Sequence, residues 1–364
     1  MCKLGVEANQ QHVFRDSNMA VTLKQIAEKA GVSPSTVSHA IRGILPGKRP
    51  LASETVIRIR NVASELGYRP NMLAAGLAKS KTYTIGVLVA SLRGDFYERI
   101  LEGITHVVHP QFTPLLTVHN YDKNRERREL EVLIGKRVDG IIAAVSGCDE
   151  NVPLYSELIN THHIPLVFVD RSITSLECPV VRSDHFRSTY IAVKELYGLG
   201  HRRIVFGVGG RETDSTQIFK DGYIQAMRDA GCEASSRIIF KQTGSWTKSE
   251  LKQFASELIA SIRSSSPRPT ALLVQADWLA YEVLAECQLT GIKVPEELSV
   301  MGMEDCDPSA LPGISLSTIK VELEQVGRIA AEILLKLMNG QRPDRQKVLI
   351  PPSTILRKTT RMLV

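Results

Sequence analysis

The chain has 364 residues, of which 43% are apolar, and its formal net charge is +6. This length exceeds one average domain and predicts two or three. No run approaches the ~18 consecutive apolar residues that span a bilayer, which argues against a membrane protein. The six cysteines form no C-x-x-C pair and no compact cluster with histidines, so they indicate free thiols in a reducing cytoplasm.

The placement of the charge is more informative than its size. Residues 1–82 hold twelve Lys or Arg and five Asp or Glu, a net +7, whereas the remaining residues hold 33 and 34, a net −1. A small basic domain on a neutral body is typical of nucleic-acid binding. The charge alone is equally compatible with a solvated basic surface. Sequence motifs are needed to distinguish nucleic-acid binding from such a surface.

The first twenty residues lack an apolar core of signal-peptide length and mix charges with Gln and Asn. We expect them to form a disordered extension, or to precede an alternative start at Met19. They do not resemble an export signal, so we expect a cytoplasmic protein.

Three short helices are expected after this extension. Thr22 and Gln25 have the spacing of a capping box, which predicts that the first helix begins here. Gly31 provides the next turn, because glycine adopts a positive φ at little cost. Ser33 and Pro34 open the second helix, with serine as the cap and proline at the first helical position.

The third helix is expected to begin at Ser53, with apolar residues at helical spacing that include Ile59 and Ala63, and to end before Gly67. The first two helices and their glycine turn form the helix-turn-helix pattern. Asn71 can then cap a helix of about two turns, which is marginal by itself.

Strands and helices alternate from Thr84 onward. The apolar strands are expected at 84–90, 115–119, 140–145, 165–170, 204–207, 271–275 and 299–302, and the helices at 98–108, 125–136, 189–199, 218–230, 249–263 and 279–290. Strands that are apolar throughout and separated by helices predict parallel sheets covered on both faces. There are too many units for one compact sheet, so we expect two doubly wound lobes. Ligands bind such folds beyond the carboxyl ends of the strands.

No catalytic motif is found in the sequence. Gly-x-Ser-x-Gly, the phosphate-binding Gly-x-x-x-x-Gly-Lys-Ser/Thr and the metal-binding His-Glu-x-x-His are all missing. We therefore expect no enzyme, no cofactor and no metal.

The segment from Val21 to Ile41, VTLKQIAEKAGVSPSTVSHAI, resembles the head of the lactose-repressor (LacI/GalR) family. The resemblance continues through LGYRPN at 66–71, VDGII at 138–142, LGHRRI at 199–204 and VMG at 300–302. It implies a transcription regulator, most often a repressor, that works as a homodimer. Such a dimer reads a pseudopalindromic operator, and a small effector changes its affinity.

The resemblance also implies the domain organisation. We expect a disordered N-terminal extension (1–20), a helix-turn-helix DNA-binding domain (21–69), and a hinge helix with its linker (70–82). The core (83–364) binds the effector and forms the dimer. It is of the periplasmic-binding-protein type, with two doubly wound parallel-sheet lobes and a chain that crosses between them.

Several departures concern the effector. Phe219 stands where the family usually has an effector-binding arginine, Ala276 replaces a common asparagine, and Glu304 replaces an aspartate. These changes leave the fold intact and put the usual sugar or nucleobase effector in doubt.

The second helix of the motif should enter the major groove of DNA. The resemblance assigns base contacts to Pro34, Ser35 and His39. The short hydroxyls of Ser33, Thr36, Ser38 and Thr22 suit phosphate oxygens, although simple capping is nearly as good an interpretation for Ser38. The DNA-binding set is completed by Asn71 and by Leu77, whose side chain matches the family's minor-groove wedge.

The expected effector site combines acids, aromatic rings and one arginine near predicted strand ends. Its candidates are Phe96, Tyr97, Asp170, Arg171, Phe219, Asp277, Trp278 and Glu304. Carboxylates can bind paired hydroxyls and tryptophan can stack on a sugar face, so a sugar or polyol is expected. Three acids could instead suit a cationic ligand. For Phe96 and Tyr97, packing of the lobe is an equally good interpretation.

Two other protein classes have to be weighed. A solute-binding component of a transporter would share the core, but it would need a signal peptide and no basic head. An enzyme on an α/β scaffold would need a nucleophile with its base or a cofactor loop. The sequence favours neither.

Overall fold

The computed structural model describes residues 21–42, 51–68, 81–147, 149–211, 213–242 and 246–363. The chain splits into two compact units, Met1–Ala78 and Lys79–Val364. The expected extension (1–20) and the contacts assigned to Asn71 and Leu77 lie outside the described residues, as does most of the expected hinge and linker (70–82).

The first unit contains the three expected helices, α1 (Leu23–Ala30), α2 (Pro34–Arg42) and α3 (Ser53–Glu65). At the start of α1 the capping box is confirmed: the Thr22 hydroxyl accepts from the Gln25 backbone N–H (3.4 Å) and the Gln25 side chain accepts from the Thr22 N–H (2.8 Å). Gly31 caps the other end with a φ of 66°. We call residues 21–68 the head.

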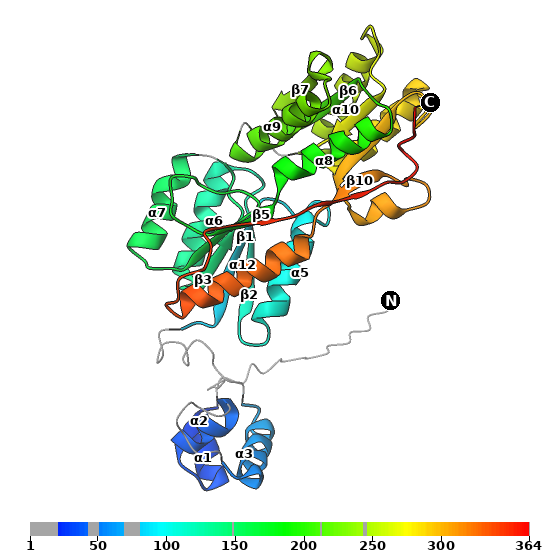
Figure 1. The fold of residues 1–364 in the computed structure, drawn as a ribbon. Coiled ribbons are helices and arrows are strands. Elements are labelled where there is room, and N and C mark those ends of the chain that lie inside the picture. Colours follow the sequence, from blue (N-terminus) through cyan, green and yellow to red (C-terminus); the bar gives the residue numbers. More distant parts are fainter. Residues whose placement is uncertain are drawn as a thin grey trace, which may run out of the picture. The chain divides into compact units, whose positions relative to one another are not determined.

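The three helices lie against one another (Figure 1), and their apolar side chains form the core of the head. Its buried residues are Ile26, Ala27, Ala30, Val37, Ala40, Ile59 and Ala63. Few side chains make up this core, because a domain of this size buries little of its surface. Small losses therefore weigh heavily on the stability of the head.

Replacing Thr22 with alanine is expected to lower the stability of the head by about 1 kcal/mol, because α1 loses a hydroxyl that satisfies one of its first amide groups. The check is thermal unfolding of the head followed by circular dichroism. Thr22→Ser keeps the hydroxyl and serves as the control. A serine variant as unstable as the alanine variant would show that the cap does not matter.

The second unit contains two six-stranded sheets, one in each lobe. In the first lobe the order is β11-β5-β4-β3-β1-β2, and every pairing is parallel. The strands are β1 (Thr84–Val89), β2 (Thr113–Val118), β3 (Gly140–Ala143), β4 (Leu166–Val169), β5 (Val180–Ser183) and β11 (Lys347–Ile350).

In the second lobe the order is β12-β10-β9-β8-β6-β7. Its strands are β6 (Ile204–Gly210), β7 (Arg237–Gln242), β8 (Ala271–Val274), β9 (Ser299–Glu304), β10 (Ser317–Lys320) and β12 (Ser353–Ile355). All pairings are parallel except that of β12 with β10, which departs from the expected parallel sheet. The reason is that β12 enters from the other lobe and so runs away from the cleft that the other strands run towards.

Helices cover both faces of each sheet, as doubly wound lobes require (Figure 1). In the first lobe, α5 (Phe96–Val108) and α12 (Leu323–Met338) lie on one face, and α6 (Lys123–Gly135) and α7 (Val152–Asn160) on the other. The second lobe is covered by the pairs α8 (His185–Gly198) with α9 (Asp214–Asp229) and α10 (Lys248–Arg263) with α11 (Asp277–Thr290).

Three connections between described strands and helices join the lobes. The chain leaves the first lobe after β5, returns after β10 to form α12 and β11, and leaves again to form β12. The last crossing is the red segment of Figure 1. The described part of the second unit also contains three short 3-10 turns: η1 (Asp149–Asn151), η2 (Glu233–Ser235) and η3 (Asp307–Ala310).

The expected strands and helices that fall on described residues are all present, with bounds that agree within four residues; the helix expected to begin at Asn71 lies outside those residues. Strands β5, β7 and β10 to β12 and helices α7 and α12 were not expected. Polar caps explain why four helices begin earlier than expected: Asp122, Asp184, Thr213 and Thr247 each accept a hydrogen bond from the first turn.

Helices α5 and α12 approach so closely that their backbones touch. A Cβ atom on Gly103 would lie 2.0 Å from the carbonyl oxygen of Glu324, and one on Gly327 would lie 2.0 Å from that of Ile100. Only glycine fits both places. This contact fixes α5, whose first residues reach the cleft. Within the described part of the chain, no helix is long and apolar enough to cross a membrane.

Candidate functional site

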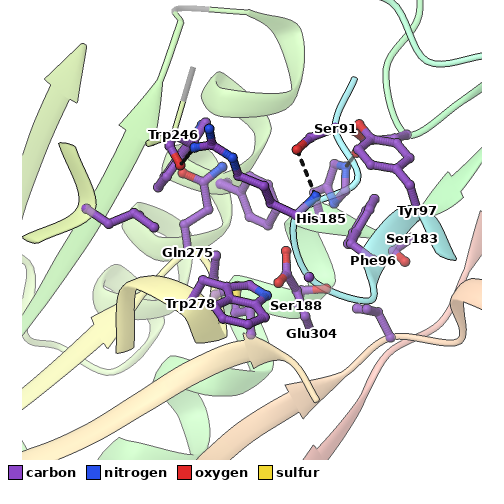
Figure 2. Close-up of a pocket in the computed structure, with 18 of the residues that line it drawn as sticks. Ser91, Phe96, Tyr97, Ser183, His185, Ser188, Trp246, Gln275, Trp278 and Glu304 are labelled. Atoms are coloured by element: carbon purple, nitrogen blue, oxygen red, sulfur yellow. Dashed lines mark hydrogen bonds and ion pairs between the residues drawn. The ribbon is translucent and has the colours of Figure 1, made fainter. Parts of the chain in front are cut away.

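A pocket of about 620 Å³ lies between the two lobes of the second unit, beyond the carboxyl ends of their strands (Figure 2). Ser91 follows β1, Asp170 follows β4, Ser183 ends β5 and Glu304 ends β9. Doubly wound sheets place ligands at this edge because the loops that follow the strands converge there. Both sheets therefore contribute to one site.

Seven of the eight residues expected at the effector site line this pocket, namely Phe96, Tyr97, Asp170, Arg171, Phe219, Trp278 and Glu304. Two aromatic residues also belong to the core, because Tyr97 is buried in the first lobe and Phe219 in the second. Tyr97 thus packs in the core of its lobe and also lines the pocket.

Asp277 does not line the pocket. It is fully buried, and its two carboxyl oxygens accept hydrogen bonds from the hydroxyls of Ser309 (2.5 Å) and Thr318 (2.6 Å) and from the Cys306 backbone N–H (3.0 Å). Gly302 leaves room for it, since a Cβ there would lie 2.2 Å from Asp277 Oδ1. Burial raises the pKa of Asp277 to about 7. These contacts favour a structural role in place of the expected contact with effector.

The negative charge of Asp170 is stabilised by neighbouring polar side chains. Its φ is 63°, and its carboxylate accepts a hydrogen bond from the Tyr97 hydroxyl (2.8 Å). His185 Nε2 and Arg171 Nε each lie 3.7 Å from one of its oxygens. Burial by itself would raise the pKa of Asp170, but His185, Arg171 and Tyr97 together hold that pKa below its ordinary value.

Glu304 behaves differently from Asp170. Burial raises its pKa well above the ordinary value, and the nearby Asp277 adds to the shift. Both effects disfavour the charged carboxylate of Glu304. The three acids do not present three free negative charges to the pocket, because Asp277 is turned away, burial disfavours the charge of Glu304, and Asp170 is matched by Tyr97 and Arg171. This arrangement disfavours the cationic ligand that three acids had suggested.

Several lining residues were missed by the sequence reasoning. Ser91 and Gln275 stand at the ends of expected strands, so their positions could have identified them. Ser183 and His185 lie at the end of β5 and just after it, and because this strand was not expected, neither was their position at the pocket. Trp246 lies in a loop, where no local pattern indicates a site. Further lining residues not expected from the sequence include Tyr121, Ser188, Lys248, Tyr281, Glu282 and Met303.

Polar contacts join the two lobes. Arg93 Nη1 donates to the Trp246 carbonyl oxygen (3.1 Å), and Arg182 Nη1 lies 3.1 Å from Asp214 Oδ2. The Asp307 backbone N–H donates to Asp95 Oδ2 (3.0 Å). In each pair one residue belongs to the first lobe and the other to the second. Of these residues, Arg93 and Trp246 also line the pocket.

The head has a second candidate site at the start of α2. Pro34 and Ser35 are exposed there, and the Ser33 hydroxyl lies 2.8 Å from those of Ser35 and Thr36. The Thr36 backbone N–H donates to Ser33 Oγ (3.2 Å), so Ser33 caps the helix as expected.

The remaining residues expected to contact DNA differ in exposure. Thr22 is exposed, and Thr36 and Ser38 are half-buried. His39 is largely buried, with 7% of its surface exposed. Its ring is therefore not openly presented, unlike the residues at the start of the helix.

Comparisons with known proteins address both units. Residues 22–71 match the family described as bacterial regulatory proteins, lacI family, and residues 193–360 match the periplasmic binding protein-like domain. Catabolite control protein A of Priestia megaterium is 28% identical over 94% of this chain and all of that protein. The HTH-type transcriptional repressor PurR of Aliivibrio salmonicida is 28% identical over 94% of this chain and 99% of its own.

Solved structures agree with these relatives. A crystal structure of the lac repressor dimer bound to operator and the anti-inducer ONPF matches with a TM-score of 0.78 and 25% identity, over 94% of this chain and 99% of that one. The likeness therefore extends over the helix-turn-helix and both lobes.

Proposed function

The chain belongs to the lacI family of bacterial regulatory proteins, and from this membership we propose that it represses transcription until a small molecule changes its affinity for operator DNA. That it is a DNA-binding transcription regulator follows from the family, which consists of regulators and not enzymes. It binds operator DNA as a homodimer. A cytoplasmic location is part of the proposal.

The exposed start of α2 is the observation that supports the proposed DNA contact. Pro34, Ser35 and His39 are proposed to face base edges, and His39 has to turn outward from its buried position to do so. The hydroxyls proposed to face phosphates belong to Thr22, Ser33, Thr36 and Ser38. Asn71 and Leu77 complete the proposed set from the sequence alone.

A gel-shift titration with upstream DNA tests this proposal. His39→Ala is expected to reduce the preference for operator over random DNA by about 1–3 kcal/mol, because a base contact is lost. Lys48→Ala, which removes a positive charge from the sequence between the second and third helices of the head, is expected to weaken binding to all sequences alike and to lower its salt dependence. If both variants lose the same affinity on specific and random DNA, the assignment of His39 is wrong.

The interlobe pocket is the observation that supports the proposed effector site. Its size suits a small molecule, and residues from both lobes line it. The proposed contacts are Phe96, Tyr97, Asp170, Arg171, Phe219, Trp278 and Glu304. A sugar or polyol is proposed, in line with the sugar-like ligands of lac repressor structures. Thermal-shift screening of the full chain against sugars, polyols and amines tests this, with the release of operator as a second measurement.

We also propose the division of the chain made from the sequence: an extension (1–20), the DNA-binding domain (21–69), a hinge helix and linker (70–82) and the core (83–364). The compactness of Met1–Ala78 and Lys79–Val364 supports it. Limited proteolysis, which cleaves preferentially at exposed connections, tests whether the first cuts fall within 70–82.

A further inference from the structure

Two buried polar atoms on the wall of the pocket lack a hydrogen-bond partner among the described residues. They are Ser183 Oγ and His185 Nε2, and their residues are only 5% and 7% exposed. Buried polar atoms are nearly always paired, because losing water without gaining a partner is costly. Two such atoms on one pocket wall point to a ligand that pairs with them.

A hydroxyl group is the chemistry that fits this place. His185 Nε2 lies 3.7 Å from Asp170 Oδ1, too far for a direct hydrogen bond. A ligand hydroxyl placed beside this gap can donate to Asp170 Oδ1 and stay within reach of His185 Nε2. Its oxygen can at the same time accept a hydrogen bond from the Ser183 hydroxyl. A hydroxyl both donates and accepts, whereas a carboxylate only accepts and an ammonium only donates.

The charges around this place also favour an uncharged ligand. Asp170 accepts a hydrogen bond from the Tyr97 hydroxyl and has the Arg171 guanidinium beside it, so it does not need a cation. The Arg171 guanidinium stands over the ring of Tyr121 as well as beside Asp170, so it does not need an anion.

Aromatic rings surround the same place. The His185 ring stacks on Phe219, with ring centroids 4.4 Å apart, and Phe96 meets Tyr97 edge to face at 5.0 Å. Figure 2 shows Ser183, His185, Phe96 and Tyr97 on one side of the pocket, opposite Trp246, Gln275 and Trp278. A polyhydroxyl ring here would place further hydroxyls against phenyl faces, where they would stay unpaired. A flat ring with one hydroxyl avoids this loss and can pack against the aromatic walls.

We propose that Ser183 and His185 form a subsite for a phenol-type group, that is, an uncharged aromatic ring whose single hydroxyl lies against Ser183 Oγ and His185 Nε2. This inference rests on the proposed effector site and narrows the ligand that it takes. Any sugar part of the effector then lies towards the tryptophans.

Intrinsic fluorescence provides the test, because the chain has two tryptophans and both line the pocket. The probes are 4-methylphenol, its methyl ether 4-methylanisole, 4-hydroxyphenyl β-D-glucoside and glucose, titrated into the full chain. We expect 4-methylphenol to bind at least about tenfold more tightly than the ether, which keeps the ring and loses the donor. The hydroxyphenyl glucoside is expected to bind more tightly than glucose.

Two variants locate the effect. Ser183→Ala removes one partner, and His185→Phe removes Nε2 while keeping a ring to stack on Phe219. Each is expected to reduce the affinity for 4-methylphenol to about that for the ether. Ser215→Ala is the matched control, because the Ser215 hydroxyl is equally buried and unpartnered among the described residues and does not line the pocket. It is expected to bind like the natural chain.

The outcomes separate this inference from the proposed function. Equal affinity for phenol and ether, tighter binding of glucose than of 4-methylphenol, or no response to any aromatic probe would overturn the phenol-type subsite. Operator binding, measured by gel shift on the same samples without ligand, decides the proposed regulator independently. A chain that retains specific DNA binding but prefers glucose would keep the function and lose the inference.

Discussion

Replacing Ile59 with alanine is expected to unfold the head while the core keeps its ligand-binding pocket. Ile59 is fully buried and packs among the residues of all three helices. Removing its methyl groups leaves a cavity and costs about 2–5 kcal/mol. The head spans only 48 residues (21–68), and small domains have only a few kcal/mol of stability to lose. Specific DNA binding is therefore expected to disappear.

The measurement has two parts, one for each unit. Specific operator binding follows the head by gel shift, and thermal unfolding followed by circular dichroism separates its transition from that of the core. Ile57→Ala is the matched control, since Ile57 belongs to the same helix and is 59% exposed. It is expected to bind operator nearly as well as the natural chain. Equal losses in Ile57→Ala and Ile59→Ala would contradict the packing described for α3.

Replacing Asp277 with alanine is expected to destabilise the core by about 3 kcal/mol at pH 5, whereas Asp277→Asn costs little. The alanine variant leaves the Cys306 backbone N–H without its acceptor and opens a space beside Gly302. An asparagine keeps one oxygen for Cys306 and Ser309, and its amide group can donate to the Thr318 hydroxyl, which can also accept.

The same residue predicts how stability depends on pH. Asp277 has a pKa of about 7 in the folded chain against an ordinary 3.8, so between these values the folded state holds a proton that the unfolded state has released. Raising the pH through this window therefore lowers the free energy of unfolding. Below this pH window Asp277 is protonated in both the folded and the unfolded state. Above the window the folded state carries the full free-energy cost of ionising the buried carboxyl.

The measurement is denaturant unfolding of the core between about pH 3.5 and 8, a range that covers roughly both pKa values of Asp277. Comparing the natural chain with Asp277→Asn separates the contribution of Asp277 from that of other groups such as Glu304. The advantage of the asparagine variant is expected to grow as the pH rises. Quenching of tryptophan fluorescence by a pocket ligand is expected to be the same in both, because Asp277 does not line the pocket. A pH-independent difference, or loss of ligand binding in Asp277→Asn, would restore Asp277 to the effector site.

Local chemistry explains which parts of the fold the sequence could predict. The Thr22 capping box, the turn at Gly31 and the Ser33 cap are interactions between residues a few positions apart, and all three are present. The end of a strand can also be recognised from neighbouring residues, because an apolar run stops where polar side chains begin. For this reason Asp170, Trp278 and Glu304 were correctly expected near the cleft.

Tertiary structure decided what depends on distant partners. The carboxyl group of Asp277 could have faced the cleft or the protein interior, and Ser309 and Thr318, more than thirty positions away, determine that it faces inward. Strand β12 is antiparallel only because the chain returns from the other lobe. Ser183 and His185 became visible as unpartnered atoms only after the lobes enclosed them. A sequence displays residue types and their spacing, whereas burial and pairing arise when segments far apart in the chain pack together.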